Sequence, residues 1–314
     1  MAAIVDSRLR GNDGACGYLW SIQVFQTLIY NQAMTFLEQL KEAERRNQSM
    51  LCVGLDPEPS KFPAHIKSDA SKIYDFCAAI VDATADLVIS FKPQIAYFHA
   101  HRAEDQLEKL MQHMRSTAPH VPVILDAKRG DIGSTAAQYA IEAFERYGCD
   151  AVTLSPFMGF DSVQPYLAYH GKGAFLLCRT SNPGGDDFQA QRLSSVAGEP
   201  LLYEHIAKLA QGEWNTNGQL GLVVGATYPA EIERIRRVAP HVPLLIPGVG
   251  AQGGDAVATV KAGWKAQNGQ TTAPIIVNSS RAVLYASSGA DFADAARKIA
   301  VQTRDVLQAA RVDI

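Results

Sequence analysis

Short apolar segments alternate with longer amphipathic segments along most of the chain. From residue 50 onward, eight apolar segments of four to six residues are rich in aliphatic side chains: 50–55, 86–91, 121–125, 150–154, 174–178, 220–224, 243–246 and 274–277. Each is nearly continuous in its apolar character, which is typical of parallel strands that are covered on both faces. The pattern therefore predicts eight buried parallel strands.

Helix-like segments lie between these strands, at 69–83, 102–116, 133–147, 202–212, 229–238, 254–262 and 291–310. Strict alternation of strand and helix implies a parallel sheet. Eight such units in about 260 residues fit a closed (β/α)8 TIM barrel better than an open, doubly wound sheet. No G-x-G-x-x-G follows the first strand, which disfavours dinucleotide binding. We therefore expect an α/β protein built as a TIM barrel.

The first 33 residues differ from the rest of the chain. Residues 18–30 are apolar, but Gln23 and Gln26 interrupt them and charges of both signs precede them, which disfavours a secretory signal. The pattern becomes helical at Met34, where four apolar side chains share one face: Phe36, Leu37, Leu40 and Ala43. We expect residues 34–314 to form a single catalytic barrel domain. Residues 1–33 are then a disordered extension, or the product of a start codon assigned too far upstream.

Composition excludes several classes of protein. The 29 Lys and Arg nearly balance the 32 Asp and Glu, giving a net charge of −3, so the chain is not a strongly basic nucleic-acid binder. No run of 18 apolar residues is long enough for a membrane span. The five cysteines form no C-x-x-C pair, which favours a reducing compartment and argues against a zinc site. We expect a cytoplasmic protein without a bound metal ion.

Charged residues follow the first three predicted strands: Asp56, Lys92, Asp126, Lys128 and Asp131. Taken singly, each has an ordinary explanation, as a turn former, a helix N-cap or a solvated loop charge. Asp126 and Lys128 are two residues apart, however, so on an extended strand end both point into the barrel mouth. Because active sites of these barrels lie at the C-terminal ends of the strands, the pattern predicts a functional charge cluster there. Such a cluster is costly to desolvate unless the charges are used.

Two features at strands 7 and 8 point to a phosphate group. A glycine-rich loop runs from Pro247 to Gly254, and Ser280 and Arg281 follow the last strand. Loops 7 and 8 of a barrel commonly bind phosphate, and arginine presents a forked donor to its oxygens. A flexible surface loop beside a solvated arginine is the plainer alternative. After strand 5, the turn at Ser181 offers hydroxyl and amide groups that could bind a heterocycle or simply form a turn.

Five motifs together resemble one enzyme family. The segment 125–140, LDAKRGDIGSTAAQYA, resembles the D-x-K-x-x-D motif of the orotidine 5′-phosphate decarboxylases, in particular their longer bacterial branch (type 2). The other four occur in matching order: GLDP at 54–57, FKPQIAYF at 91–98, SNPGG at 181–185 and PGVGAQGGD at 247–255. The resemblance covers roughly residues 50–285. One departure is Ser280, where the family usually has glycine. The serine keeps the backbone N–H donor, but its side chain narrows the expected phosphate pocket slightly.

The resemblance implies a carboxy-lyase that converts orotidine 5′-monophosphate to UMP and CO2, the last step of de novo UMP biosynthesis. The family uses no cofactor, so electrostatic preorganisation must stabilise the electron pair left on C6. Lys128 resembles the proton donor to C6. Asp126 resembles the protein carboxylate that lies against the departing carboxylate of the substrate. Lys92 would link Asp126 to the ribose hydroxyls.

The remaining roles also come from the resemblance. Asp56 would bind the ribose, and Asp131 with Thr135 would come from the partner subunit of a homodimer. Substrate contacts would be made by five further residues: Ser181 at the pyrimidine edge, and Pro247, Gln252, Ser280 and Arg281 around the phosphate.

Two alternatives remain open. A sibling barrel with the same D-x-K-x-x-D motif is a metal-dependent sugar-phosphate enzyme such as a hexulose-phosphate synthase, but its metal needs further strand-end carboxylates, which strands 4 to 8 lack. Activity in excess chelator separates that enzyme from the decarboxylase. A barrel that only senses nucleotides would tolerate loss of Lys128. We expect neither a nucleic-acid nor a membrane partner for this chain.

The domain assignment predicts that residues 1–33 are dispensable. A protein that starts at Met34 should keep its activity and its thermal midpoint, because the expected barrel core begins with the helix at Phe36. The test compares turnover and thermal unfolding of the truncated and full-length proteins. Loss of folding in the shorter protein would show that the first segment is part of the domain.

Overall fold

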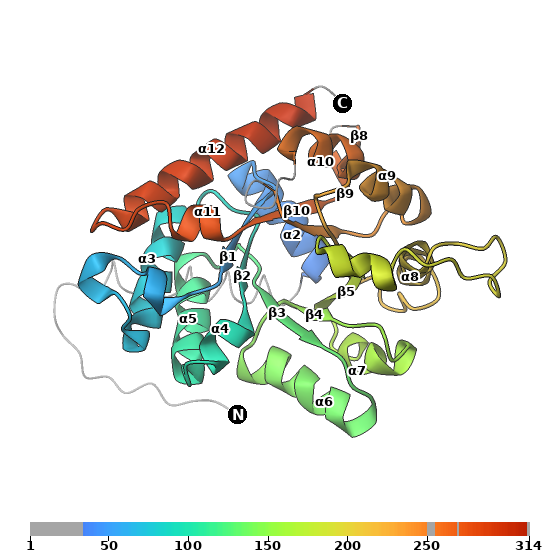
Figure 1. Cartoon of the computed structure of the whole chain (residues 1–314), viewed down its shortest axis with the longest axis horizontal. Coiled ribbons are helices and arrows are strands. Elements are labelled where there is room, and N and C mark those ends of the chain that lie inside the picture. Colours follow the sequence, from blue (N-terminus) through green and yellow to red (C-terminus); the bar gives the residue numbers. More distant parts are fainter. Residues whose placement is uncertain (1–33, 250–254, 269, 313–314) are drawn as a thin grey trace, which may run out of the picture.

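Eight parallel strands form the centre of the molecule, and helices surround them (Figure 1). The computed structural model describes residues 34–249, 255–268 and 270–312. The barrel strands are β1 (Leu51–Leu55), β2 (Ser90–Pro93), β3 (Ile124–Arg129), β4 (Ala151–Leu154), β5 (Gly173–Arg179), β6 (Leu220–Val224), β7 (Leu244–Pro247) and β10 (Ile275–Ser279). These strands confirm the predicted TIM barrel.

The strands are hydrogen-bonded in the order β2-β1-β10-β7-β6-β5-β4-β3, and every pair is parallel. Two isolated parallel bridges, Phe91 with Val123 and Gln94 with Asp126, join the edge strands β2 and β3 and close the ring. The second bridge places the C-terminal end of β2 directly beside Asp126. Closure thus brings Lys92 and Asp126 to neighbouring positions on the barrel rim.

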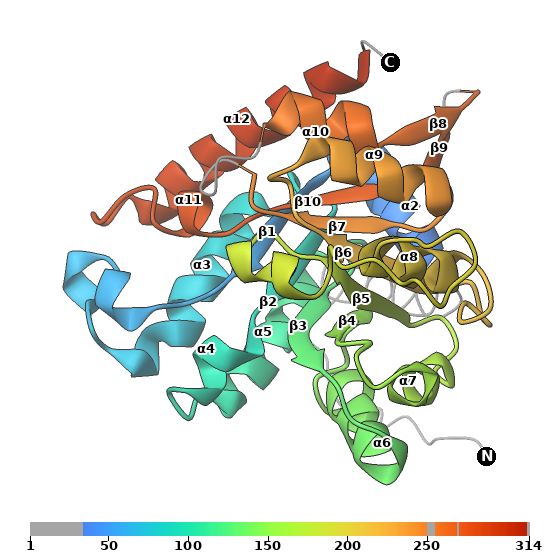
Figure 2. The ribbon, with the colours of Figure 1, turned by 45° about the vertical axis from the view of Figure 1, so that its right-hand side comes forward.

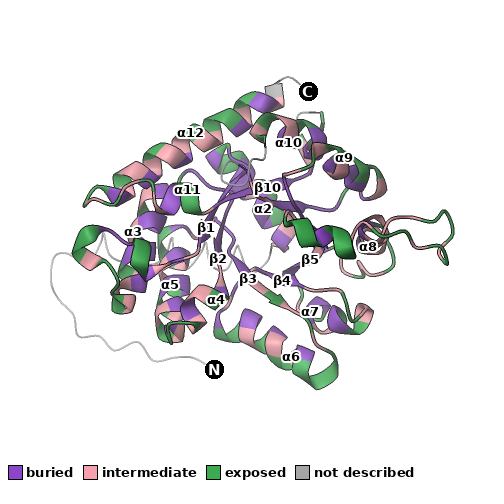
Figure 3. Ribbon diagram, viewed as in Figure 1, coloured by how far each residue is buried: buried purple, intermediate pink, exposed green. Residues whose placement is uncertain are grey.

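The longer helices follow the predicted segments closely, whereas three short helices of four or five residues were not predicted. The helices are α2 (Phe36–Asn47), α3 (Ile73–Thr84), α4 (Ile95–His99), α5 (Glu104–Thr117), α6 (Gly133–Ile141), α7 (Gln164–Leu167), α8 (Leu202–Gln211), α9 (Pro229–Val238), α10 (Ala256–Gly263), α11 (Arg281–Leu284) and α12 (Phe292–Val312). After α6 the chain continues through a π-helical turn, Glu142–Arg146. Figure 2 shows the larger helices packed outside the strands, and Figure 3 shows that their buried faces point inward.

Helix α2 covers the N-terminal end of the barrel. Phe36, Leu40 and Ala43 are fully buried and share a core cluster with one inward residue at each barrel strand: Cys52, Ile89, Ile124, Ala151, Phe175, Val223, Leu245 and Ile276. The rings of Phe36 and Phe175 meet edge to face at 5.7 Å. This apolar plug closes one end, so the polar groups of the barrel interior gather at the other.

Three sequence predictions need correction. The ladder of β2 begins at Ser90 rather than residue 86, and that of β3 begins at Ile124 rather than residue 121, because apolar character reports burial and not strand pairing. Both strands also end later than predicted, at Pro93 and Arg129, so Lys92, Asp126 and Lys128 lie within the strands and not after them. The sequence also gave no sign of the hairpin β8 (Lys265–Gln267) and β9 (Gln270–Ala273), whose residues are polar and largely exposed.

The prediction for residues 1–33, including Cys16, lies outside the described residues. The other four cysteines are unpaired and buried. In the described part of the chain, no helix has the length and apolar character that a membrane crossing requires.

Candidate active site

Asp126 lies between two lysine ammonium groups at the C-terminal end of the barrel. Its Oδ2 accepts a hydrogen bond from Lys92 Nζ at 2.8 Å, and its Oδ1 accepts one from Lys128 Nζ at 2.6 Å. The side chains of Lys92 and Asp126 are buried, whereas that of Lys128 is 47% exposed. The structure thus brings together three of the charged residues that the sequence places at the strand ends.

An irregularity in β3 determines how Lys128 is presented. The register between β3 and β4 shifts between Leu125 and Arg129, and Lys128 itself adopts a left-handed conformation with φ of 47°. The sequence analysis assumed that regular strand alternation places Lys128 and Asp126 on the same side. The structure shows instead that the irregular backbone at Lys128 brings its ammonium group to Asp126. Such bulges commonly redirect a side chain next to an active site.

Thr153 on β4 supplies the hydrogen-bond acceptor for two backbone N–H groups at this bulge. Its Oγ1 accepts hydrogen bonds from the backbone N–H groups of Ala127, at 3.0 Å, and Lys128, at 2.9 Å. The same hydroxyl donates to Asp126 Oδ1 at 2.9 Å. One buried side chain therefore fixes both the carboxylate and the backbone that carries the exposed lysine.

The charges of the cluster reinforce one another. Burial alone would raise the pKa of Asp126, but the ammonium groups of Lys92 and Lys128 outweigh it and hold that pKa well below its ordinary range. Burial alone would lower the pKa of Lys92, but the carboxylates of Asp126 and Asp56 raise it above its usual value. At neutral pH the site therefore holds an ionised carboxylate between two cations.

A cavity of about 270 Å³ opens over this cluster. Besides the cluster itself, its described walls come from strands β4 to β7 and the turn after β5: Thr153, Leu177, Thr180, Ser181, Asn182, Val223, Leu245 and Pro247. Of the predicted substrate-binding residues, Ser181 and Pro247 therefore line the same space as the two lysines. The arrangement places charge on one side of the cavity and hydroxyl and amide groups on the other.

Asp56, Ser280 and Arg281 lie at the neighbouring strands β1 and β10. Asp56 follows β1, and Arg281 is the first residue of α11. The hydroxyl of Ser280 accepts from Asn278 Nδ2 at 3.2 Å, and it lies so close to Gly54 that a Cβ at that glycine would come within 2.0 Å of it. Gly54 thus makes room for the serine that stands where the resembled family usually has glycine.

Five predicted residues do not line this cavity: Asp56, Ser280 and Arg281, and also Asp131 and Thr135. Asp131 lies beyond the end of β3, where its Oδ1 accepts a hydrogen bond from the N–H of Ile132 at 2.8 Å. Thr135 is exposed on α6. Neither side chain lines the cavity over the cluster. The predicted position of Gln252 lies outside the described residues.

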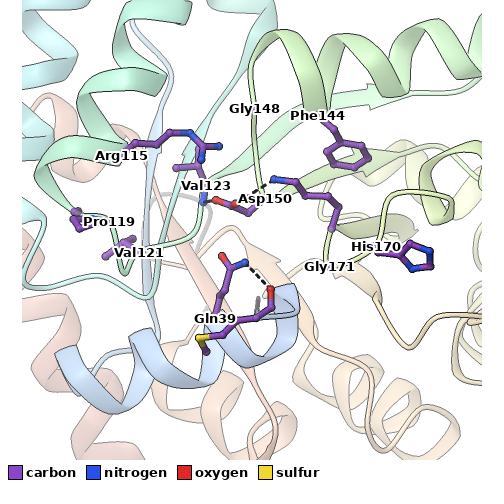
Figure 4. A pocket seen from close by; sticks show the side chains of 13 residues that line it. Gln39, Arg115, Pro119, Val121, Val123, Phe144, Gly148, Asp150, His170 and Gly171 are labelled. Atoms are coloured by element: carbon purple, nitrogen blue, oxygen red, sulfur yellow. Dashed lines mark hydrogen bonds and ion pairs between the residues drawn. The ribbon is translucent and has the colours of Figure 1, made fainter. Parts of the chain in front are cut away.

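A second cavity of about 350 Å³ lies at the opposite, N-terminal end of the barrel (Figure 4). Arg115, Phe144 and Asp150 are among its walls, and α2 borders it through Gln39. Asp150 Oδ2 accepts from the backbone N–H of Val123, so this carboxylate anchors the start of β3. None of the predicted site residues borders this larger cavity. We therefore place the candidate active site at the smaller one, where the charge cluster lies.

Sequence reasoning missed Thr153 and gave Asn278 no role of its own. Thr153 is the one polar residue in the strand AVTL, and a buried hydroxyl in an otherwise apolar strand was the available signal. Asn278 stands beside the predicted Ser280, but nothing in its spacing indicates that it holds the serine hydroxyl. In the described ranges, no group of three or more His, Cys, Asp or Glu side chains is placed to hold a metal ion.

Comparisons with known proteins agree with one another. Residues 49–299 match the family model described as orotidine 5′-phosphate decarboxylase / HUMPS family. The chain is 80% identical over 280 residues to an orotidine 5′-phosphate decarboxylase of Polaromonas naphthalenivorans, covering 89% of this chain and 98% of the relative. It is 78% identical over 284 residues to that of Albidiferax ferrireducens, covering 88% and 99%. The solved structure of Leishmania donovani OMP decarboxylase matches with a TM-score of 0.75 and 36% identity, covering 89% of this chain and 99% of that one.

The role of Thr153 gives a direct prediction. Thr153→Val keeps the shape of the side chain but removes the hydroxyl, leaving two backbone donors without their acceptor. We expect a loss of about 1–3 kcal/mol in the free energy of unfolding and a fall in kcat/KM. Urea denaturation and steady-state kinetics measure the two effects. Thr153→Ser, which keeps the hydroxyl, is the matched control, and equal behaviour of the two variants would contradict the assignment.

Proposed function

The chain belongs to the orotidine 5′-phosphate decarboxylase / HUMPS family and converts orotidine 5′-monophosphate to UMP and CO2, and on that premise we propose the roles of its residues. The reaction is the last step of UMP biosynthesis and makes the protein a carboxy-lyase. The observation that supports the proposed mechanism best is the carboxylate of Asp126 held between Lys92 and Lys128.

We propose that Lys128 is the proton donor. When the bond between C6 and the carboxyl group breaks, CO2 leaves and the bonding electron pair stays on C6. An ammonium group beside that carbon stabilises the developing negative charge, then transfers a proton to C6 and recovers one from water. Lys128 is the more exposed of the two lysines, which supports it rather than Lys92 as the group that reaches the substrate.

Asp126 and Lys92 prepare this step. The ionised Asp126 holds the Lys128 ammonium through a hydrogen bond and lies against the carboxyl group that departs. Lys92 compensates its charge and extends from the cluster toward the ribose. Because these groups are fixed before the substrate binds, little reorganisation is needed during the reaction.

The other residues bind the parts of the substrate that do not react. We propose that Asp56 accepts from a ribose hydroxyl and that Ser181 binds the pyrimidine edge. Arg281 then binds the phosphate together with the loop that starts at Pro247, Gln252 and the backbone of Ser280. Binding energy at the phosphate, far from C6, can help to orient the ring over Lys128.

We propose that two subunits form a homodimer through the face around α6. Large apolar side chains are exposed there. Ile132, at 48%, and Ile141, at 38%, lie at the two ends of α6, and Phe157, at 84%, and Met158, at 53%, come just before the turn Phe160–Ser162, which contacts α6. Such a group is unusual on a free surface and is typical of an interface. Asp131 and Thr135 lie beside this group of side chains, so the partner's copies could reach the site across that contact.

The buried cysteines support a reducing compartment such as the cytoplasm. Four thiols are buried and unpaired in the described part of the chain, and burial raises the pKa of Cys52 and Cys149 to about 12.

The experiment that tests the mechanism replaces the proposed donor. Lys128→Ala should abolish decarboxylation, because Lys92, the other ammonium of the cluster, is buried and paired with Asp126, while UMP still binds and the fold persists. Substrate absorbance, UMP titration and circular dichroism measure these three properties. Wild-type enzyme in excess chelator is the reference, since the proposed residues alone carry the reaction. Turnover at the wild-type rate in Lys128→Ala would refute the role of the lysine.

The dimer proposal predicts complementation between two inactive variants. If Asp131 acts in the partner's site, a heterodimer of Lys128→Ala and Asp131→Ala subunits has one doubly altered site and one intact site. Random mixing should then restore about a quarter of wild-type activity, because half of the dimers are mixed and each has one intact site of two. Activity is measured after the two proteins are co-refolded. No recovery in a mixture that contains heterodimers would show that Asp131 does not act across the interface.

A further inference from the structure

The hydroxyl of Tyr285 joins two loops at the rim of the barrel. It donates a hydrogen bond to the backbone carbonyl of Asp56 at 2.8 Å and accepts one from the backbone N–H of Glu58, also at 2.8 Å. Both groups belong to the segment that leaves β1. The phenol ring stacks on Phe76, with ring centres 6.1 Å apart and planes 12° from parallel. The hydroxyl is thus held on a packed ring and binds the loop at two points.

Tyr285 is also fixed to the helix that begins with the proposed phosphate ligand. Helix α11 runs from Arg281 to Leu284, and the N–H of Tyr285 donates to the carbonyl of Arg281 at 3.1 Å. The helix is a single turn, so the positions of Arg281 and Tyr285 are closely linked. One residue therefore connects the start of α11 with the loop that carries Asp56.

The carboxylate of Asp56 depends on that connection. Its Oδ1 is buried and has no hydrogen-bond partner among the described residues. Its charge still acts at the site, because it is one of the two carboxylates that raise the pKa of Lys92. Since no side-chain hydrogen bond holds this oxygen, its position follows from the backbone. Tyr285 holds that backbone at the carbonyl of Asp56 and at the N–H of Glu58.

We propose that Tyr285 is a positioning residue that keeps the ribose ligand Asp56 at a fixed separation from the phosphate helix α11. The inference rests on the proposed roles of Asp56 and Arg281. A substrate gripped at its ribose and its phosphate can use that binding energy to orient the reacting ring only if the two subsites keep their spacing. Tyr285 touches no reacting atom in this account.

Tyr285→Phe tests the proposal, because it removes the hydroxyl and keeps the stacked ring. Two backbone groups lose their partner, and we expect kcat/KM for orotidine 5′-monophosphate to fall about tenfold. A merely structural tyrosine would lower the unfolding midpoint without any link to Asp56. Tyr147→Phe is the matched control, since that buried hydroxyl contacts His99 Nε2 at 3.2 Å and lines neither the cavity nor the rim loops.

A double-mutant cycle with Asp56→Asn supplies the decisive comparison. If Tyr285 acts through Asp56, the Tyr285→Phe change should cost little once Asp56→Asn is present. Additive losses, or a wild-type kcat/KM for Tyr285→Phe, would overturn the positioning role while leaving the ribose role of Asp56 intact. A wild-type kcat/KM for Asp56→Asn would instead overturn the ribose assignment, and the inference with it.

One measurement needs no variant and covers the case in which Tyr285→Phe fails to fold. The amide hydrogen of Glu58 should exchange slowly with solvent in the wild-type protein, because it is bonded to the hydroxyl oxygen of Tyr285. Exchange should be slower still when UMP is bound, since the nucleotide then contacts both of the loops that Tyr285 joins. Hydrogen exchange followed by NMR measures both rates. Exchange at the rate of an exposed amide, with or without UMP, would show that the bridge does not form.

Discussion

The ion triad of Lys92, Asp126 and Lys128 is the interaction on which the rest of the site depends. A buried carboxylate is costly unless it is paired and its remaining lone pairs are satisfied. Here two ammonium groups and the Thr153 hydroxyl satisfy it. The same contacts that make Asp126 tolerable in the barrel hold Lys128 in place over the cavity. Stability and chemistry therefore rest on one set of hydrogen bonds.

The barrel makes this arrangement possible by separating its two ends. Helix α2 fills the N-terminal end with apolar side chains, which leaves the polar interior positions at the C-terminal rim. Parallel strands then bring Lys92, Asp126 and Thr153 together from β2, β3 and β4, although they are far apart in sequence. The hydrogen-bond ladder of β3 is interrupted by a bulge at Lys128, and this bulge directs the exposed lysine toward Asp126.

Much of this could be predicted from the sequence, and the failures have physical causes. Eight apolar segments sufficed for the barrel, because burial on both faces of a parallel strand leaves a strong pattern. The strand-end charges indicated the cluster, but Thr153 was missed since its role depends on a bulge that no local pattern encodes. The hairpin β8–β9 was missed because its polar, exposed residues carry no period. Asp131 and Thr135 do not line the cavity of their own subunit, and their roles across a dimer contact stay predictions.

The ionisation state of Asp126 tests the central claim most directly. In protein labelled with ¹³C at its aspartate carboxyl groups, the resonance of Asp126 can be followed by NMR as the pH is lowered. Because the two ammonium groups hold its pKa well below the ordinary range, the account predicts no change in that resonance between neutral pH and about pH 4, near the usual aspartate pKa. Protonation of Asp126 in or above that ordinary range would contradict the ion triad and the mechanism built on it.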